Sequence, residues 1–381
     1  MRILHIGKYY PPFLGGMETV LWNLTEGLLD RSCEVTVLTA GDGPLDRQET
    51  VVGPMSGRKG RLVRASVFGH LNSQPLTLTL MGLIRREIAL LNPDLVHLHL
   101  PNPLAAAAWL GLAAGRSPDS PPLAVWYHAD ITRQRVGRFL VRPIVNRCLK
   151  QAVGISVSSE TLASQSPVLA LWQDKVGVIP FGIDPAPWNR ITPALDGPFL
   201  FVGRLVPYKG LDVLLEALVR VPEAELVIIG DGPLESRLVE QAAKSGISRR
   251  VVFAGPMDQA GVAGHLTRAR ALVLPSVDAS ETFGLVQLEA MAAGVPVIAS
   301  DLATGVREVG QPGRTCLLVP PGDVGALAGA MTRLLGDPVL ADQLGAAGRL
   351  RFQDRFTREK MIDRLLVWYS SLFDINPGEA S

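Results

Sequence analysis

The stretch PSVDASETFGLVQLEAMAAGVPVIASD, residues 275–301, has the pattern of a strand–loop–helix–strand unit. It follows a short aliphatic run that ends at Leu274, and it closes on a second such run, PVIAS. Between the two runs a loop carries Glu281, and a helix that opens near Phe283 contains Glu289. A buried strand, a polar loop and an amphipathic helix in this order are typical of parallel α/β folds.

The start of this helix predicts a phosphate site. The first N–H groups of a helix have no partner within it, and the helix dipole adds about half a positive charge there. A diphosphate directed at the backbone of residues 284–286 is therefore expected to bind without a metal ion. Glu281 is then placed to hold sugar hydroxyls, and Glu289, one to two turns into the helix, to reach a ribose. Alternatively, Glu281 is an ordinary exposed loop acid and Glu289 a capping or solvated one, and these are the commoner roles of two glutamates taken alone.

The same alternation of β-rich runs and helical patterns extends over the whole chain. Predicted strands cover residues 2–7, 34–40, 94–100, 123–129, 154–159, 199–203, 225–231, 251–255, 271–276 and 296–300. Predicted helices cover residues 18–31, 76–91, 138–151, 211–220, 234–244, 285–293, 326–335 and 358–372, and the Ala-rich run 104–114 is expected to be a core helix.

A segment rich in Pro and Gly near residues 178–193 interrupts this pattern and divides the chain into two Rossmann-like halves. We expect an N-terminal domain at 1–180, a linker at 181–195 and a second domain at 196–355. The last helical segment, 356–381, is expected to pack back on one of the two halves, and the N-terminal half is favoured. The predicted fold class is α/β, with two Rossmann-like domains facing each other across a cleft, where ligands of open α/β sheets bind.

Two cations follow the predicted strand at 199–203. In the segment FVGRLVPYKG, Arg204 and Lys209 come just after the carboxyl end of the strand and before a helix. Arginine offers a rigid fork of donors and lysine a point charge, so the two are suited to neutralise a departing phosphate. A solvated basic loop is the alternative, and it is less favoured because the Glu281 loop belongs to the same domain.

Glycine patterns argue against two common nucleotide sites. Gly15 and Gly16, between the first strand and the first helix, would let the backbone approach a ligand closely, but they are not part of a GxGxxG motif. The sequence GDGPLE at 230–235 has Glu235 in place of the third glycine, and no GxxxxGK[ST] motif occurs. A nicotinamide-binding fingerprint and a P-loop therefore both lack support.

Composition narrows the class of protein further. Lys and Arg total 37 against 36 for Asp and Glu, so the chain lacks the basic excess of a general nucleic-acid binder. Three scattered cysteines without a CxxC pair are typical of a reduced protein without a structural zinc. The N-terminus lacks the apolar run of a signal peptide, and no stretch has the roughly 20 apolar residues of a membrane span. We expect a cytoplasmic protein, at most peripheral at the inner face of a membrane.

Taken in order, these motifs resemble the retaining glycosyltransferase family 4, whose members have the GT-B fold. The motifs are GG at 15–16, HAD at 128–130, IPFGID at 179–184, FVGRLVPYKG, IIGDGP, VVFAG, VLPS, and a pair of glutamates eight apart followed by AMAAGVPV. They cover nearly the whole chain, so the set is far more specific than any one motif. Cys316 departs from the glycine that is usual in relatives, and we expect little effect on function.

The resemblance implies how a nucleotide sugar is held. Arg204 and Lys209 bind the donor's diphosphate, and Gly16 faces it across the cleft. Glu281 and the backbone of residues 283–284 hold the donor sugar, and His128 contacts this sugar near its 6-position.

The resemblance also implies contacts with the nucleoside. Glu289 holds the ribose, while residues 252–256 and the nearby Gly230 flank the base. The complete expected set has catalytic residues His128, Arg204, Lys209 and Glu281, and donor-binding residues Gly16, Gly230, Gly255, Pro256, Phe283, Gly284, Leu285, Val286 and Glu289.

His97 and His99 raise the question of a metal. They lie two residues apart in a predicted strand, so they point to the same face. The sequence shows no third ligand that clusters with them, and we expect no metal site and no cofactor beside the nucleotide-sugar substrate. A core role or an acceptor-side role is left, with His99 and Asn102 near the acceptor.

The segment 133–150 is basic and lacks any acid. Its cations, interleaved with apolar residues, are Arg133, Arg135, Arg138, Arg142, Arg147 and Lys150. They suit anionic lipid headgroups or a lipid pyrophosphate, and a solvated helix face is an equally supported interpretation. Pro143 is expected to interrupt any long helix in this segment.

The predicted function is transfer of a sugar, with retention at the anomeric carbon, from a nucleoside diphosphate to an acceptor hydroxyl. The stretch YHADITRQR, residues 127–135, resembles bacterial O-antigen and exopolysaccharide mannosyltransferases. This favours GDP-mannose over a UDP-sugar, and a glycan or lipid-linked acceptor. Two alternatives are a sugar-nucleotide epimerase of similar fold and a non-catalytic nucleotide-sugar-binding protein.

Overall fold

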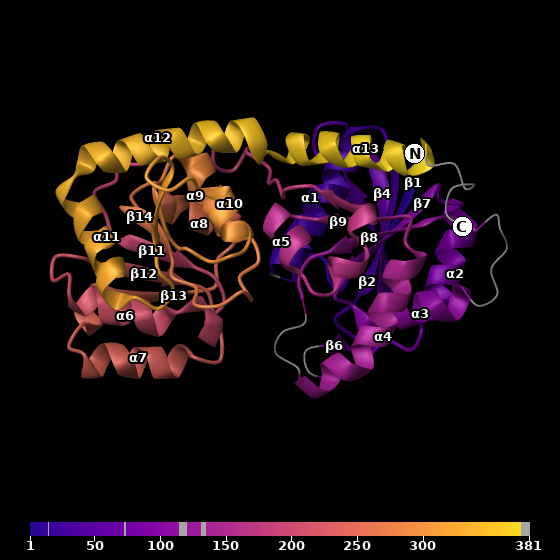
Figure 1. The fold of residues 1–381 in the computed structure, drawn as a ribbon, viewed down its shortest axis with the longest axis horizontal. Coiled ribbons are helices and arrows are strands. Elements are labelled where there is room, and N and C mark those ends of the chain that lie inside the picture. The colour runs from indigo at the N-terminus through magenta and orange to yellow at the C-terminus, as the bar shows by residue number, and fades with distance from the viewer. Residues whose placement is uncertain (14, 72–73, 114–119, 131–134, 375–381) are drawn as a thin grey trace. The chain divides into compact units, whose positions relative to one another are not determined.

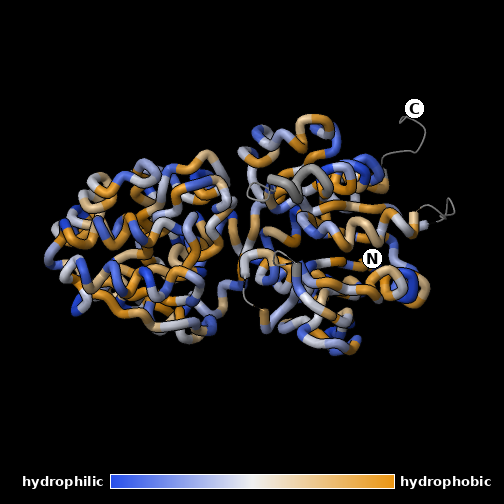
Figure 2. Tube along the Cα trace, turned by 90° about the horizontal axis from the view of Figure 1, so that it is seen from below, coloured by the Kyte–Doolittle hydropathy of each residue, from blue (hydrophilic) through white to orange (hydrophobic). Residues whose placement is uncertain are grey.

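The computed structural model describes residues 1–13, 15–71, 74–113, 120–130 and 135–374 (Figure 1). The chain forms two compact units. Unit 1 comprises Met1–Phe181 together with the C-terminal segment from Arg358, and unit 2 comprises Gly182–Thr357. The expected linker covered residues 181–195, and residues 182–195 belong to unit 2. Hydrophobic residues, orange in Figure 2, run through the inside of each unit.

Unit 1 is built on an eight-stranded sheet with the order β10-β9-β8-β7-β1-β2-β4-β3. Its neighbours are parallel except for β3 and β4, which form an antiparallel pair at one edge. The chain passes from β1 to β2 on one side and later to β7 on the other, so a topological switch point lies between β1 and β7. The strands are β1 (Arg2–Ile6), β2 (Glu34–Ala40), β3 (Arg47–Val52), β4 (Lys59–Ala65), β7 (Leu95–Leu100), β8 (Leu123–Tyr127), β9 (Gly154–Val157) and β10 (Val176–Val178). A separate two-stranded sheet pairs β5 (His70–Leu71) with β6 (Gln74–Pro75).

Helices cover both faces of the unit 1 sheet. On one face, α2, α3 and α4 bury a core with alternate strand residues such as Leu98. On the other face, the ring of Tyr369 in α13 meets that of His97, and Trp368 lies close to the backbone of Gly177. The helices are α1 (Gly16–Asp30), α2 (Leu80–Leu91), α3 (Pro103–Ala113), α4 (Arg135–Gln151), α5 (Glu160–Gln165) and α13 (Arg358–Asp374), with short 3-10 turns η1 (Leu169–Leu171) and η2 (Gln173–Lys175).

Unit 2 has a fully parallel six-stranded sheet with the order β13-β12-β11-β14-β15-β16. Numbered within the unit, this is the order 3-2-1-4-5-6 of doubly wound nucleotide-binding folds, with its switch point between β11 and β14. The strands are β11 (Phe199–Val202), β12 (Leu226–Ile229), β13 (Val251–Gly255), β14 (Ala271–Leu274), β15 (Val297–Ser300) and β16 (Cys316–Val319). The helices are α6 (Leu211–Val219), α7 (Glu235–Lys244), α8 (Gln259–Leu266), α9 (Val286–Ala293), α10 (Gly305–Val309), α11 (Val324–Gly336) and α12 (Pro338–Arg355), with η3 (Pro207–Lys209) and η4 (Ser248–Arg250).

Each unit is thus a Rossmann-like α/β domain, and the predicted fold class is confirmed. All ten predicted strands are present, whereas strands β3–β6, β10 and β16 and helices α5, α8, α10 and α12 were not anticipated. The Ala-rich helix α3 is buried on one side only, since Ala105 and Trp109 are inaccessible while Ala107 is exposed. The expectation that Pro143 interrupts the basic helix is wrong, because α4 continues through it. Pro143 is exposed, so water can replace the backbone hydrogen bond that proline removes. None of the described helices combines the length and hydropathy needed to cross a membrane.

The contact between α1 and α13 depends on Gly27. A Cβ atom at this position would lie 2.5 Å from Cγ1 of Ile362, so the two helices approach closely only because the side chain is missing. Next to it, the guanidinium of Arg358, which is 3% exposed, forms an ion pair with Glu26 at 2.7 Å. A segment from the far end of the chain is thereby part of the unit 1 core.

We expect Gly27→Ala to destabilise unit 1 by about 1–3 kcal/mol, because the added methyl group overpacks against Ile362. Gly82 in α2 has open space at its Cβ position, so Gly82→Ala should instead stabilise the chain by about 0.5–1 kcal/mol. Thermal unfolding of both variants measures the difference. A gain in stability for Gly27→Ala would contradict this packing. In the double variant with Ile362→Ala, the loss of stability should be smaller than the sum of the losses in the two single variants.

Candidate functional site

The switch point of unit 2 brings polar side chains of two loops together. One loop leaves the carboxyl end of β11 and carries Arg204 and Lys209, and the other leaves β14 and carries Glu281. Because β11 and β14 are parallel, hydrogen-bonded neighbours, both loops emerge at the same edge of the sheet.

Lys209 and Glu281 form an ion pair that joins these loops. Nζ of Lys209 lies 2.6 Å from Oε2 of Glu281, and the hydroxyl of Ser276 donates to the same oxygen at 2.9 Å. Glu281 is only 7% exposed, so the interpretation as a surface carboxylate is wrong for this residue. A carboxylate in such a position requires a cation and hydrogen-bond donors, and Lys209 and Ser276 supply them.

Close backbone packing fixes the distance between the two loops. Gly210, which follows Lys209, has a φ of 66°, and a Cβ atom there would overlap the carbonyl group of Pro275. The N–H of Val277 donates to the carbonyl of Tyr208 at 2.8 Å. Glycine at position 210 therefore allows both the turn and the contact that brings Lys209 to Glu281.

Arg204 differs from Lys209 in its surroundings. Its side chain is exposed, and no ion pair joins it to another of the residues that the structure describes. The charges of Lys209 and Glu281 offset each other, which leaves Arg204 as the uncompensated cation of the β11 loop. This arrangement favours an anionic ligand.

The start of α9 adds further positive potential. Gly284 has a φ of 71°, and its N–H group and those of Leu285 and Val286 precede or begin the helix. No side chain caps this helix, whereas α8, α11 and α12 each begin with an aspartate whose carboxylate accepts a first-turn N–H. The α9 start can therefore receive an external anion. Phe283 is 3% exposed and packs edge-on against Phe356, which anchors the segment just before the helix.

Glu289 lies in the first turn of α9, not one to two turns into it, because the helix begins at Val286. The side chain is half-buried, and desolvation raises the pKa of its carboxyl group to about 7. The alternative of a solvated carboxylate therefore does not fit Glu289 either. A ligand with hydroxyl groups would supply the hydrogen bonds that stabilise the ionised form.

Of the residues expected near a nucleotide base, Gly230 follows β12, residues 252–255 belong to β13, and Pro256 follows that strand. The N–H of Gly230 donates to the carbonyl of Gly255 at 2.8 Å. Gly230 has a φ of 130°, and a Cβ atom there would overlap the carbonyl group of Gly203, so this position requires glycine. Pro256 and Val252 are exposed on the same strand and the turn that follows it.

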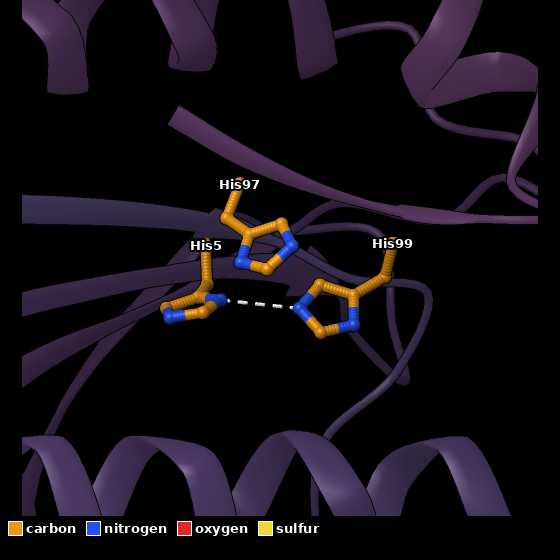
Figure 3. Close-up of side chains that lie close together, drawn as sticks. All are labelled: His5, His97 and His99. Atoms are coloured by element: carbon orange, nitrogen blue, oxygen red, sulfur yellow. Dashed lines mark hydrogen bonds between the residues drawn. The ribbon is translucent and has the colours of Figure 1, made fainter. Parts of the chain in front are cut away.

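Unit 1 has its own polar group at the switch point between β1 and β7. His5 of β1 is paired in register with His97 of β7, and His99 follows two residues later on the same face. Figure 3 shows the three rings facing one another. All three are buried, at 0%, 0% and 4% exposure, and each offers a ring nitrogen within 4.8 Å of the other two. The statement that no third ligand accompanies His97 and His99 is therefore wrong, since the register of two strands adds His5.

The fit of this cluster to a metal ion is poor. Nδ1 of His5 and Nε2 of His99 are 3.1 Å apart and share a hydrogen bond, and Nδ1 of His97 is 2.6 Å from the hydroxyl of Tyr369. Both ring nitrogens of His99 are engaged, Nε2 with His5 and Nδ1 with Nε2 of His128, so an ion could bind His99 only if one of these hydrogen bonds were broken. Burial lowers the pKa of His5 to about 3, and burial with neighbouring histidines holds the pKa values of His97 and His99 well below the usual range.

The other predicted residues of unit 1 are placed as follows. His128 follows β8, is 3% exposed, and lies with Nε2 2.9 Å from Nδ1 of His99; burial lowers its pKa to about 3. Asn102 donates to the carbonyl of Gly7 at 3.1 Å and accepts from the N–H of Ala105 at 3.3 Å, so its amide holds the loop before α3. Gly16 is exposed and is the first residue of α1.

Much of the basic segment 133–150 lies outside the described residues or side chains. Arg133 is not described, and neither are the side chains of Arg135 and Arg138. Arg142, Arg147 and Lys150, further along α4, are exposed. Exposure is compatible with both interpretations of this segment.

Two family models match the chain, one in each unit. Residues 14–187 match Glycosyltransferase Family 4, and residues 196–351 match Glycosyl transferases group 1.

Proteins from bacteria are similar over almost the full length. O-antigen chain mannosyltransferase C of Escherichia coli is 31% identical over 98% of this chain and 99% of its own. D-rhamnosyltransferase WbpZ of Pseudomonas aeruginosa is 34% identical over 94% and 92%, and the phosphatidyl-myo-inositol mannosyltransferase of Mycobacterium leprae is 33% identical over 91% of each.

Solved structures share the fold. The sucrose-phosphate synthase (tll1590) of Thermosynechococcus elongatus superimposes with a TM-score of 0.82 at 24% identity, over 98% of this chain and 100% of its own. Anabaena HepE in complex with UDP-glucose has a TM-score of 0.77 at 18% identity, over 97% and 100%.

We expect Glu289→Gln to remove a pH dependence of stability. The folded-state pKa of Glu289 is raised from 4.5 to about 7, so the folded chain binds this proton more tightly than the unfolded one. The stabilisation is present below pH 4.5 and is lost as the pH rises through 7. The glutamine variant should therefore be more stable than the parent at pH 8, by about 1–3 kcal/mol, and equal to it at pH 4.

Thermal unfolding at the two pH values measures this effect. Glu240→Gln is the matched control, because Glu240 lies on α7, where its hydrogen bond with Lys244 lowers the pKa of the carboxyl group instead. This control should gain no stability at pH 8. Equal behaviour of Glu289→Gln and the parent chain at both pH values would contradict the raised pKa.

Proposed function

Because the chain belongs to glycosyltransferase family 4 and has its GT-B fold, we propose that it is a retaining hexosyltransferase that needs no metal ion. The proposed donor is GDP-mannose, and the proposed acceptor is a hydroxyl group of a glycan or lipid-linked polysaccharide precursor. The observation that carries this proposal is the Lys209–Glu281 ion pair beside the uncompensated Arg204 at the switch point of unit 2.

The difficult step of such a reaction is the departure of a diphosphate on which negative charge accumulates. Arg204 and the uncapped start of α9 supply fixed positive potential for it, and Lys209 adds a charge that its pairing with Glu281 holds in place. Preorganised charges of this kind stabilise a transition state without reorganisation during the reaction. Protein groups therefore take the part that a divalent cation has in other transferases.

Glu281 is assigned to sugar binding and not to nucleophilic attack. Its Oε2 atom already accepts hydrogen bonds from Lys209 and Ser276, which lowers its nucleophilicity. We propose that Oε1 accepts hydrogen bonds from the donor sugar. Retention then follows from attack of the acceptor on the face that the diphosphate leaves, with the diphosphate assisting deprotonation.

The remaining contacts keep the roles that the family resemblance implies. We propose that Glu289 binds the ribose, that the backbone of residues 283–286 binds phosphate and sugar, and that Gly230, Gly255 and Pro256 flank the base. From unit 1, Gly16 and His128 contribute contacts with the donor. His99 and Asn102 stay proposed acceptor-side residues, although the amide of Asn102 is occupied by backbone groups.

The choice of mannose is supported by relatives. Two of the similar proteins named above are mannosyltransferases, and one of them acts in O-antigen synthesis by its name. A UDP-sugar is the second candidate, because the similar structure of Anabaena HepE holds UDP-glucose.

We expect GDP or GDP-mannose to raise the midpoint of thermal unfolding of the full chain more than UDP, ADP or their sugars do. At a concentration one hundred times the Kd the gain is about 2.7 kcal/mol, or roughly 5–10 °C for a unit of this size. Arg204→Ala and Lys209→Ala should lose the shift, and Arg204→Ala should lower kcat by about 10²–10³ because a transition-state contact is removed. Lys244→Ala, which removes an exposed ion pair on α7, is the matched control.

The outcomes separate the alternatives. Consumption of donor without any acceptor would indicate an epimerase, and binding without turnover would indicate a nucleotide-sugar-binding protein. Loss of turnover with EDTA would contradict the metal-independent mechanism. A selective shift with UDP would replace GDP-mannose by a UDP-sugar, and no shift with any nucleotide would leave only the fold.

The proposal of a lipid-linked acceptor goes together with a second proposal, that residues 133–150 bind an anionic membrane surface. The full chain should then float with vesicles that contain anionic lipid and not with neutral vesicles, and the double variant Arg142→Glu/Arg147→Glu should float less. Equal recovery with both kinds of vesicle would leave a solvated helix face as the correct interpretation.

A further inference from the structure

Three histidines of unit 1, His5, His99 and His128, form a continuous path from the middle of the sheet to its ligand-binding edge. His5 and His99 are linked by a hydrogen bond of 3.1 Å, and His99 and His128 by one of 2.9 Å (Figure 3 shows the first). His97 lies against this path but is hydrogen-bonded elsewhere, to Tyr369. The path ends just past the carboxyl end of β8, at the edge where ligands of α/β sheets bind.

The donor and the acceptor in each of the two hydrogen bonds follow from the chemistry of a neutral imidazole. A neutral imidazole has one N–H donor and one acceptor nitrogen. His99 uses both ring nitrogens, so if it donates to one neighbour it must accept from the other. Only two arrangements remain: the donors run from His5 through His99 to His128, or in the opposite direction.

The environment of His5 selects between these arrangements. Its Nε2 atom is buried and has no hydrogen-bond partner among the described residues. In the reverse arrangement Nδ1 of His5 is the acceptor, so the proton would be on this Nε2 atom as an unsatisfied buried donor. In the forward arrangement Nε2 is only an unused lone pair, which is a smaller penalty.

We propose that His5 and His99 are positioning residues that fix His128 as the Nδ1–H tautomer, so that it presents a hydrogen-bond donor to the donor sugar. This inference rests on the proposed function for the identity of the ligand, but the tautomer itself is a property of the free protein. Nε2 of His128 is occupied by His99, which leaves Nδ1 to meet a ligand. A neutral ring in this state donates to an oxygen of the sugar and does not accept a proton from it.

The surroundings keep the rings in the neutral state that this arrangement requires. Burial lowers the pKa values of all four histidines far below neutrality. The rings of His99 and His128 are inclined by only 23°, which suits a hydrogen bond in the ring plane. Phe181 and Trp126 lie against the ring of His128, with centroids 5.6 and 5.9 Å away.

The tautomers can be observed directly by ¹⁵N NMR of histidine-labelled full-length protein, because the chain has only six histidines. The chemical shifts and couplings of the ring nitrogens distinguish Nδ1–H from Nε2–H rings. The unliganded parent protein should show His5, His99 and His128 all as Nδ1–H rings. An Nε2–H ring at His128 would overturn the proposal.

Variants separate positioning from packing. His99→Leu should remove the single tautomer of His128 and lower kcat/KM by about 10- to 100-fold, as loss of an orienting partner of a histidine commonly does. His97→Leu is the matched control, because His97 is equally buried on the same strand and face, and it should leave the tautomer unchanged. An unchanged tautomer in His99→Leu would overturn the proposal.

Two further measurements complete the test. Metal analysis of the purified chain should find no stoichiometric metal, and a bound ion ligated by His5, His97 and His99 would replace the path by a metal site. Addition of GDP-mannose should shift the ¹⁵N signal of Nδ1 in His128. If the tautomers are as proposed and the signal does not move, the donor assignment fails while the positioning path stands.

Discussion

The chain depends on one topological constraint that appears in both units. A parallel sheet whose crossovers turn in opposite directions from a central strand must leave a gap between two loops at its carboxyl edge. In unit 2 this gap lies between β11 and β14, and in unit 1 between β1 and β7. The candidate site residues lie at these two places: the Lys209–Glu281 pair in one, and the buried histidines in the other. The cores on either side of the sheets are built mainly from apolar strand and helix residues.

Much of the fold could be predicted from the sequence, and each feature that was missed has a physical reason. Buried strands are visible as short aliphatic runs, and the positions of Arg204, Lys209 and Glu281 after such runs led to the prediction of a site there. The edge hairpin β3–β4 was missed because RQETVV and KGRLVRA lack a continuous apolar run. The pairing of Lys209 with Glu281 joins residues 72 apart. That of His5 with His97 follows from strand register, which a single sequence does not display.

Both sites place polar groups in a buried environment, but they compensate for the loss of hydration in different ways. The unit 2 pair keeps its charges and offsets them locally, with a hydroxyl group as an additional donor. The buried histidines of unit 1 avoid charge, since burial keeps them neutral, and His5, His99 and His128 satisfy four of their six ring nitrogens with one another. A charged pair suits an anionic ligand, whereas a chain of neutral rings fixes direction, because each ring can donate through only one nitrogen.

The packing of α13 on α1 has a consequence for how the chain is made. Unit 1 is discontinuous: its sheet is complete at Phe181, but Ile362, Trp368 and Tyr369 arrive only after the whole of unit 2 has been synthesised. At about 5–20 residues per second, the ribosome needs on the order of ten seconds or more for that interval. During this time the surface around Gly27, Gly177 and His97 is open to solvent and to chaperones. A nascent chain therefore completes its N-terminal domain only after α13 has been synthesised, so a product truncated before α13 is left without a finished unit 1.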